Sequence, residues 1–214
     1  MNIAQQTGKP AKKPGASAEI SARMRLIEAA TRLFCRFGIN AVGVDAVVAE
    51  AGTAKASLYK NFGSKEGLVE AVLAHEGASW REWFLDRLHR DELPPAERME
   101  RIFPILKEWF GEASFFGCPF INAIGEHDKQ DDRLRELTMA HKSAILGAIE
   151  ALASEASAAN PAMLAHQLGL LMDGAIIAAM VTKDPGAADL AQATASVLIR
   201  SALPAAGARA SVPA

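Results

Sequence analysis

Residues 43–62 read GVDAVVAEAGTAKASLYKNF and hold two short apolar patterns on either side of a glycine. The valines of the first pattern recur at the i, i+3 and i+4 spacing of a helix, over about residues 44–51. Gly52 can take the left-handed conformation that ends a helix, and Thr53 can cap a second helix over about residues 54–60. Two short helices joined by a turn that contains glycine form the helix-turn-helix unit, whose second helix fits the DNA major groove. The segment therefore predicts a DNA-binding motif.

Sequence on both sides of this motif extends the pattern. The chain carries AxxLFxxxG from Ala30 to Gly38, AG at residues 51–52, SLYxxF from Ser57 to Phe62 and SKEGL from Ser64 to Leu68. In this order and at these spacings, the region from about Ile20 to Leu73 resembles the N-terminal DNA-binding domain of the TetR family of bacterial transcriptional regulators. The resemblance implies a three-helix helix-turn-helix domain followed by a helical domain for effector binding and dimerisation.

Two positions depart from the usual family pattern. Gly43 stands where a Ser or Thr commonly caps the first helix of the motif, and glycine caps less well than a hydroxyl but far better than alanine. Val48 stands where alanine is usual, so its bulk should push the two helices slightly apart. Both changes leave the motif in place and bear on the angle at which it docks.

Side chains of the second helix and its flanks are the expected DNA contacts. Hydroxyl-bearing residues suit phosphate, and a lysine at the start of the following helix adds its charge to the free amides there. Lys55 and Lys60 reach guanine O6 and N7, contact phosphate or simply lie in solvent, and Ala56 suits a thymine methyl. The predicted DNA-binding residues are Val44, Thr53, Lys55, Ala56, Ser57, Tyr59, Lys60 and Lys65.

Half of the 214 residues are hydrophobic and 22% are charged, which describes one or two globular domains with ample core. Ala, Leu, Glu and Arg are abundant and β-branched alternation is scarce, so we expect an all-α chain of about nine helices. The two cysteines, Cys35 and Cys118, have no CxxC partner and no histidine cluster. Neither a disulfide framework nor a metal or cofactor site is therefore predicted, and Cys35 is expected to be a small core residue.

Charge is distributed unevenly along the chain. Residues 1–70 carry a formal charge of +4 and residues 71–214 carry -6. A basic first part suits a domain that touches phosphates, joined to one that does not. The first twenty residues lack an apolar core, and the most apolar helix, Met163 to Val181, is interrupted by polar residues. We therefore expect no membrane span and a cytoplasmic location.

The chain divides into four predicted parts. Residues 1–18 are expected to be a flexible basic tail, either solvated or lying along DNA. Residues 19–65 form the helix-turn-helix domain, 66–203 the effector-binding and dimerisation domain, and 204–214 a frayed tail. A long helix from about Ser64 to His89 crosses the boundary between the two domains and is the expected mechanical link.

Proline marks several helices of the second domain. Pro104 lies inside a predicted helix over about residues 96–110 and should kink or divide it. Pro119 suits the first turn of a short helix that follows an aromatic loop. Later helices are expected over about residues 131–156, 161–182 and 188–203.

The last two predicted helices carry more apolar and small residues than one core-facing stripe requires. An exposed remainder would form a large apolar patch. A homodimer that packs this pair on its twofold copy as a four-helix bundle would cover the patch, and burial inside one protomer is the alternative. The candidate interface residues are Leu168, Leu171, Ala175, Ile177, Ala178, Ala195, Leu198 and Ile199.

Aromatic residues with a few polar ones among them suggest a cavity for a small effector, although cores have a similar composition. Asp173 is the most informative, because a carboxylate in an apolar helix must be paired, exposed or functional. Its partner is expected to be His141, Arg135 or a cationic ligand. The pocket candidates are Trp83, Trp109, Phe110, Phe115, Phe116, Cys118, Phe120, Asn122, Glu126, His141, His166, Met172 and Asp173.

The sequence favours a sequence-specific transcriptional regulator, most simply a ligand-responsive repressor that binds a palindromic operator as a homodimer. Cys118 precedes a short helix whose amides can lower a thiol pKa, so an electrophile or redox sensor is one alternative. A ligand-independent activator or architectural protein is another. GxxxxGK[ST], GxGxxG, GxSxG and HExxH do not occur, so no enzyme is predicted.

Overall fold

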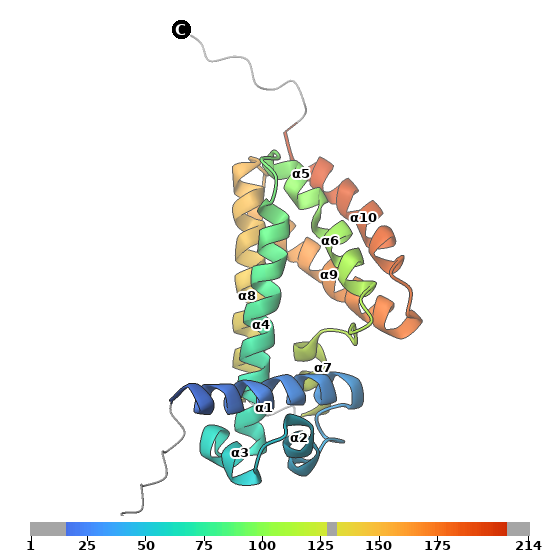
Figure 1. Ribbon diagram of the computed structural model, residues 1–214. Helices are drawn as coiled ribbons and strands as arrows, with labels where there is room; N and C mark the ends of the chain where they lie inside the picture. The colour runs from blue at the N-terminus through green and yellow to red at the C-terminus, as the bar shows by residue number, and fades with distance from the viewer. Residues whose placement is uncertain (1–15, 128–131, 205–214) are drawn as a thin grey trace, which may run out of the picture.

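The computed structural model describes residues 16–127 and 132–204, and these residues form ten α-helices without a strand (Figure 1). The prediction of an all-α chain is confirmed. The predicted tails 1–18 and 204–214 lie almost entirely outside the described residues. The helices are α1 (Ala16–Phe37), α2 (Val44–Ala51), α3 (Lys55–Phe62), α4 (Lys65–His89), α5 (Pro95–Glu100), α6 (Ile102–Phe110), α7 (Pro119–Glu126), α8 (Asp132–Glu155), α9 (Pro161–Thr182) and α10 (Ala187–Ala202).

Glycines end both helices of the helix-turn-helix motif. Gly52 has φ 59° and ψ 44°, the predicted left-handed end of α2, and Gly63 ends α3 with φ 75°. The predicted capping role of Thr53 is wrong, because α3 begins at Lys55 with Ala54 in the cap position and no side-chain cap bond. The Thr53 hydroxyl is instead buried, without a hydrogen-bond partner in the described part of the chain.

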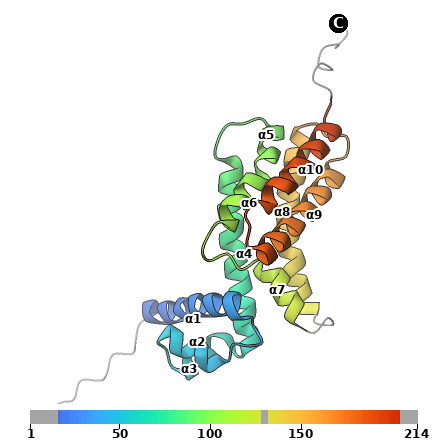
Figure 2. The ribbon, with the colours of Figure 1, turned by 90° about the vertical axis from the view of Figure 1, so that its right-hand side faces the viewer.

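Helices α1, α2 and α3 form a layer at one end of the molecule, called here the α1–α3 layer. Helix α1 packs on α2, α3 and α4. It crosses α4, and α2 and α3 lie on the side of α1 that faces away from α5, α6, α9 and α10 (Figures 1 and 2). Leu26 and Ala30 of α1, Val47 of α2 and Leu58 of α3 are buried together with Leu68 at the start of α4. The apolar spacing of the motif therefore becomes a small core that holds α3 in place.

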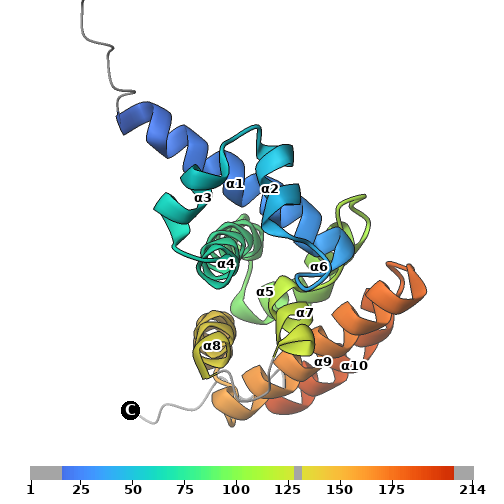
Figure 3. The same ribbon diagram turned by 90° about the horizontal axis from the view of Figure 1, so that it is seen from below.

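Helix α4 joins this layer to the rest of the molecule. It starts at the cap Ser64, whose Oγ accepts a hydrogen bond from the Gly67 amide at 3.1 Å. It then runs 25 residues, and its later part lies beside α8 (Figures 1 and 3). Phe84 and Leu88 are fully buried there. Helix α4 thus contacts α1 and α3 of the layer at one end and the helices behind the layer along its length.

The predicted helix over residues 96–110 is divided, which accounts for one helix more than expected. The break lies at Arg101, between α5 and α6, so Pro104 occupies the third position of α6. The first N–H groups of a helix have no acceptor within it, so proline removes no hydrogen bond there.

Helices α8, α9 and α10 lie side by side in chain order, and α6 packs on α9 and α10. The predicted start of α9 is confirmed, because Asn160 Oδ1 accepts from the Met163 amide at 3.0 Å and Pro161 is the first helical residue. Helix α9 has the length and the mean hydropathy, 1.6, of a membrane span, but by length and composition only. Its contacts with α6, α8 and α10 are those of a core helix.

Candidate DNA-binding surface and effector cavity

Helix α3 presents most of its predicted contact residues to solvent. Lys55, Ala56, Tyr59 and Lys60 are exposed, whereas Leu58 points into the core of the α1–α3 layer. Tyr59 keeps 45% of its surface exposed, so its ring is anchored at one side and its hydroxyl is available. This is the distribution expected of a helix that offers one face to a groove.

Four predicted contacts are less accessible, Lys65 among them. Val44 and Ser57 are half-buried, and the Thr53 hydroxyl oxygen is buried. A buried hydroxyl cannot reach a phosphate unless the turn moves. Thr53 is therefore the predicted contact that the geometry supports least.

Lys55 is tied to the preceding helix. Its Nζ lies 2.8 Å from Asp45 Oδ1 of α2, and this carboxylate raises the pKa of Lys55. Both side chains are largely exposed, and exposed pairs of this kind contribute little to stability. A phosphate or a guanine edge can therefore replace Asp45 at low cost, and the pair holds the ammonium at the α2–α3 junction until then.

Lys65 is half-buried at the first position of α4. The neighbouring amides already have acceptors, because Ser64 Oγ caps Gly67 and the Glu66 carboxylate bonds its own backbone N–H. The hydrogen bond from its own backbone N–H, and then one from the Ser64 hydroxyl, lower the pKa of the Glu66 carboxylate. The sequence predicted free amides here, and in the structure the Gly67 and Glu66 amides already have acceptors.

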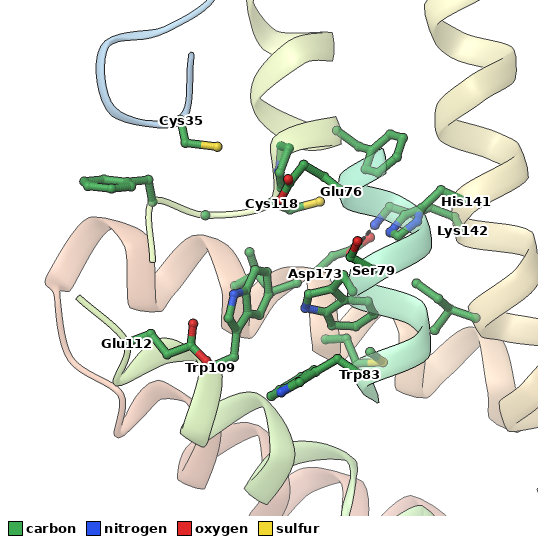
Figure 4. A pocket seen from close by; sticks show the side chains of 18 of the residues that line it. Cys35, Glu76, Ser79, Trp83, Trp109, Glu112, Cys118, His141, Lys142 and Asp173 are labelled. Carbon is green, nitrogen blue, oxygen red and sulfur yellow. Dashed lines mark hydrogen bonds and ion pairs between the residues drawn. The ribbon is translucent and has the colours of Figure 1, made fainter. Parts of the chain in front are cut away.

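Behind the α1–α3 layer lies a cavity of about 860 Å³ (Figure 4). Side chains of α1, α4, α6, α7, α8 and α9 line it, together with the loop before α7. The predicted pocket residues that it brings together are Trp83, Trp109, Phe116, Cys118, Phe120, His141, His166, Met172 and Asp173.

Four predicted pocket residues lie elsewhere. Phe110 is buried in the core against Phe115, with ring centroids 4.9 Å apart, and neither lines the cavity. Asn122 donates from Nδ2 to the Phe116 carbonyl at 3.0 Å and so holds the loop before α7. Glu126 lies at the far end of α7 against the α1–α3 layer.

Sequence reasoning missed much of the wall on α1 and α4. Glu76, Ser79, Trp80 and Trp83 line the cavity from successive turns of α4, and Cys35 lines it from α1. Of these, Trp83 was predicted as a pocket residue, whereas Cys35 was expected to be a small core residue. Glutamate and serine on the face that also carries two tryptophans are the signal that could have identified this wall, because a core stripe excludes them.

His141 is a buried polar residue, 7% exposed, at one end of the cavity. Arg81 lies 3.1 Å from its Nδ1, and its ring stacks on Phe120 at a centroid distance of 4.1 Å. Burial, with the charges of Arg81 and Lys142, lowers the pKa of His141 to about 4. The imidazole is therefore neutral at physiological pH.

Asp173 is paired with Lys142 of α8, with the lysine Nζ bonded to Oδ1. The predicted partners His141 and Arg135 are wrong, since His141 faces Arg81 and Arg135 lies 3.6 Å from Asp132. Figure 4 shows Asp173, Lys142 and His141 together with Ser79 at one side of the cavity. This side is polar, and the rest of the wall is mostly aromatic and aliphatic.

Both cysteines line the cavity as thiols. Cys118 is the residue before α7, and amides of Ile121 and Phe120 favour its thiolate as predicted. Burial outweighs them, so the pKa of Cys118 is raised. Burial and the Glu76 charge also raise the pKa of Cys35 to about 11. Within the described ranges, no group of three His, Cys, Asp or Glu side chains could hold a metal ion.

Helix α7 connects the cavity to the α1–α3 layer. It begins beside the cavity at Pro119 and ends at Glu126, whose Oε2 accepts a hydrogen bond from the backbone N–H of Asn40 at 2.9 Å. The Glu126 carbonyl accepts from Asn40 Nδ2 at 2.7 Å. Gly38, with φ 87°, allows this approach, because a Cβ there would lie 3.1 Å from the Glu126 carboxylate. We call these two hydrogen bonds the α7 latch.

The predicted dimer residues are split between core and surface. Leu168, Ala175, Ala195 and Ile199 are buried within the protomer, so the alternative of simple burial holds for them. Leu171 and Leu198 are half-buried, and Ile177 and Ala178 are exposed. Other large apolar side chains of α9 and α10 are exposed as well, and together with Ile177 we call them the α9–α10 face: Leu170, Ile177, Val181, Leu190 and Val197.

Known proteins share both parts of this architecture. Residues 26–72 match the model of bacterial regulatory proteins of the tetR family, and residues 95–195 match the tetracyclin repressor-like C-terminal domain. The chain belongs to the TetR family. It is thus a DNA-binding transcriptional regulator, and the predicted resemblance is confirmed.

Solved structures of TetR-family proteins agree with this assignment. A transcriptional regulator of the family from Streptomyces coelicolor is 25% identical with a TM-score of 0.78, covering 86% of this chain and 96% of that one. The sav143 regulator of Streptomyces avermitilis is 29% identical with a TM-score of 0.74, covering 85% and 97%. A helix-turn-helix transcriptional regulator from the region 3' of lacX in Lactococcus lactis is 26% identical over 113 residues, which span 52% of this chain and 58% of that protein.

Proposed function

We propose that this TetR-family protein is a cytoplasmic, ligand-responsive repressor that binds a pseudo-palindromic operator as a homodimer. Residues 19–65 read DNA in this proposal, and residues 66–203 bind the effector and dimerise. The observation that carries it is the cavity of about 860 Å³, whose walls include α1 of the DNA-binding layer and both helices that lead to that layer, α4 and α7.

A ligand in this cavity has three mechanical routes to the DNA, the first of which is direct contact with α1 in the cavity wall. Helix α4 continues from the cavity wall into the α1–α3 layer, and α7 reaches that layer through its latch. A ligand that fits one position of these helices better than another shifts their equilibrium by its differential affinity. The spacing of two α3 helices in a dimer changes with it, and operator affinity follows.

The dimer is supported by the α9–α10 face. Leu170, Val181 and Leu190 expose 74%, 72% and 77% of their surfaces on adjacent helices. Monomeric proteins rarely leave such side chains together in water. Twofold packing of α9 and α10 on their copies would cover the face as a four-helix bundle and would match a palindromic operator.

Operator binding is expected to depend on the start of α4 and on α3 in two separable ways. Lys65→Ala removes a phosphate contact in this proposal, so affinity should fall by a similar factor for operator and for unrelated DNA, and the salt dependence should become shallower. Lys55→Ala should reduce discrimination between operator and mutated operator by about tenfold if Lys55 reads a base. Fluorescence anisotropy over a salt series measures both effects.

Footprinting and a matched variant keep this test decisive. Lys107→Ala, which breaks an exposed ion pair with Asp189 between α6 and α10, lies far from α3 and should bind DNA like the wild type. A footprint without an inverted repeat, or an affinity that does not fall as salt rises, would show that the proposed mode of operator binding is wrong.

The alternative of a Cys118 thiol switch receives less support from the geometry. Its thiol is buried and its pKa is raised, so little thiolate is present at neutral pH. Cys118→Ser is therefore expected to leave operator release by electrophiles and peroxide unchanged. Mass spectrometry of the wild type should show slow alkylation of Cys118. Release that occurs in the wild type and disappears in Cys118→Ser would establish the thiol switch instead.

A ligand-independent activator or architectural protein would use the same α3 surface without the cavity. Thermal shifts with a panel of apolar metabolites distinguish the two functions, because a sensor is stabilised by some small molecule and an architectural protein by DNA alone. The size of the cavity favours the sensor, since drug-sized ligands occupy pockets of about 300–1,000 Å³.

A further inference from the structure

The walls of the cavity are aromatic on several sides. Trp80, Trp83 and Trp109, the three tryptophans of the chain, all line it, with Phe116 and Phe120. The Trp80 centroid lies 5.4 Å from that of Trp109 at 60° and 6.1 Å from that of Trp83 at 41°. Rings arranged at such angles offer both faces and edges to a further ring. The wall therefore suits a planar aromatic ligand.

Charge along the wall is balanced. Arg32, Arg36 and Lys142 are matched in number by Glu76, Glu112 and Asp173. Asp173 and Lys142 are paired with each other, and Glu76 accepts a hydrogen bond from the Thr31 hydroxyl at 3.1 Å. A ligand with a full charge would lose its hydration without meeting an excess of opposite charge. Electrostatics thus favour a neutral ligand.

His141 supplies a directional group. Arg81 has only donors and stays protonated, so His141 Nδ1, 3.1 Å from it, is the acceptor and Nε2 carries the proton. The pKa of His141, about 4, agrees with this neutral tautomer. The contacts of His141 within the described chain are those with Arg81, Trp80 and Phe120, and none of them engages Nε2. A buried ring at the cavity wall thus retains an unused N–H donor.

We propose that the cavity binds a neutral, planar aromatic molecule whose carbonyl-type oxygen accepts a hydrogen bond from His141 Nε2. The proposal rests on the function proposed above, in which this cavity is the effector site. The rings of the ligand lie among the tryptophans, and the oxygen of the ligand faces the polar side formed by His141, Lys142 and Asp173 (Figure 4). The oxygen sets its orientation, and the aromatic walls provide most of the buried contact area.

Four naphthalene probes of similar shape test the chemical class. Methyl naphthyl ketone carries the acceptor, ethylnaphthalene lacks it, naphthoate is anionic and naphthylmethylammonium is cationic. Equilibrium dialysis against the full-length protein measures the affinities. The ketone is expected to bind about threefold to tenfold more tightly than ethylnaphthalene, the usual worth of one neutral hydrogen bond, and more tightly than either ion.

Two variants locate the hydrogen bond. His141→Phe preserves an aromatic ring against Phe120 and removes the donor, so the advantage of the ketone should vanish while ethylnaphthalene binds as before. Met172→Leu changes the cavity wall without changing its polarity, and should keep the advantage. The comparison of probes in the wild type does not depend on whether either variant folds.

The outcomes separate this inference from the function on which it rests. Equal affinity of ketone and hydrocarbon, or tightest binding of the ammonium probe through Glu76, would overturn the inference and leave the effector site standing. Binding of the ketone without any change in operator affinity would overturn the cavity's role as effector site. Binding of no probe at all would count against both.

Discussion

Replacing Leu170 by Arg is expected to convert the protein from a dimer to a monomer and to abolish tight operator binding. Leu170 is 74% exposed in the protomer, so the change costs little stability there. Its side chain also lines the cavity, so the oligomeric state without ligand is the readout that decides this test. In a four-helix bundle of α9 and α10 with their copies, the arginine would bury an unpaired charge in each protomer. This burial should destabilise the dimer by about 3 kcal/mol or more, which raises its dissociation constant ~100-fold. Sedimentation equilibrium and light scattering measure the change.

The position of Leu170 makes this test cleaner than one at Leu171, which is half-buried and also contributes to the protomer. Met139→Arg on α8 is the matched control, because Met139 is 60% exposed and lies outside the α9–α10 face. Circular dichroism should show both variants folded. A Leu170→Arg protein that stays dimeric would exclude this face as the interface.

The fold was predictable from sequence because its helices carry local signals. Gly52 ends α2, Ser64 caps α4 and Asn160 caps α9 as their residue types indicate. These signals act over one helical turn, so they need no knowledge of the tertiary structure. Thr53 shows the limit of this reasoning, because its hydroxyl had the chemistry of a cap but the turn buried it.

The cavity was predictable only in part, because its walls come from helices distant in sequence. Composition selected Trp83, His141 and Asp173 correctly as lining residues but could not pair them. The partner of Asp173 depends on the register between α8 and α9, which places Lys142 beside it. Neighbouring positions on α8, including His141, therefore looked equally suitable from sequence.

Four of the eight dimer candidates lie in the core of the protomer for a related reason. Helix α9 is apolar around most of its circumference, so its sequence does not separate the face toward α8 and α10 from the face toward solvent. Leu168 is fully buried and Leu170, two residues later, is largely exposed. Only the packing of its neighbours distinguishes them.

Breaking the α7 latch is expected to uncouple ligand binding from operator release. Glu126→Ala removes the carboxylate that accepts from the backbone N–H of Asn40. Asn40→Ala removes the side-chain amide that donates to the backbone carbonyl of Glu126. The double variant should bind the cavity ligand as tightly as the wild type, since neither residue lines the cavity. Allosteric coupling typically changes affinity by about 5–150-fold, and here that factor should fall toward one.

The coupling is measured as the ratio of operator affinities with and without a saturating ligand, the ketone probe or any effector found by thermal shift. Linkage requires the same ratio in the ligand affinity with and without operator, which gives an internal check. Asp189→Ala is the matched control, because this exposed carboxylate pairs with Lys107 at 2.6 Å and joins α10 to α6, neither of which is a proposed coupling route.

Gly38→Ala tests the same contact from the other side. Alanine at φ 87° is strained, and its Cβ would press on the Glu126 carboxylate, so the variant should lose about 1–3 kcal/mol of stability and shift operator affinity without ligand. Thermal unfolding and anisotropy measure the two effects. If the latch variants keep the full ligand response, coupling runs through α4 or directly through α1, because both of these helices line the cavity and belong to or enter the α1–α3 layer.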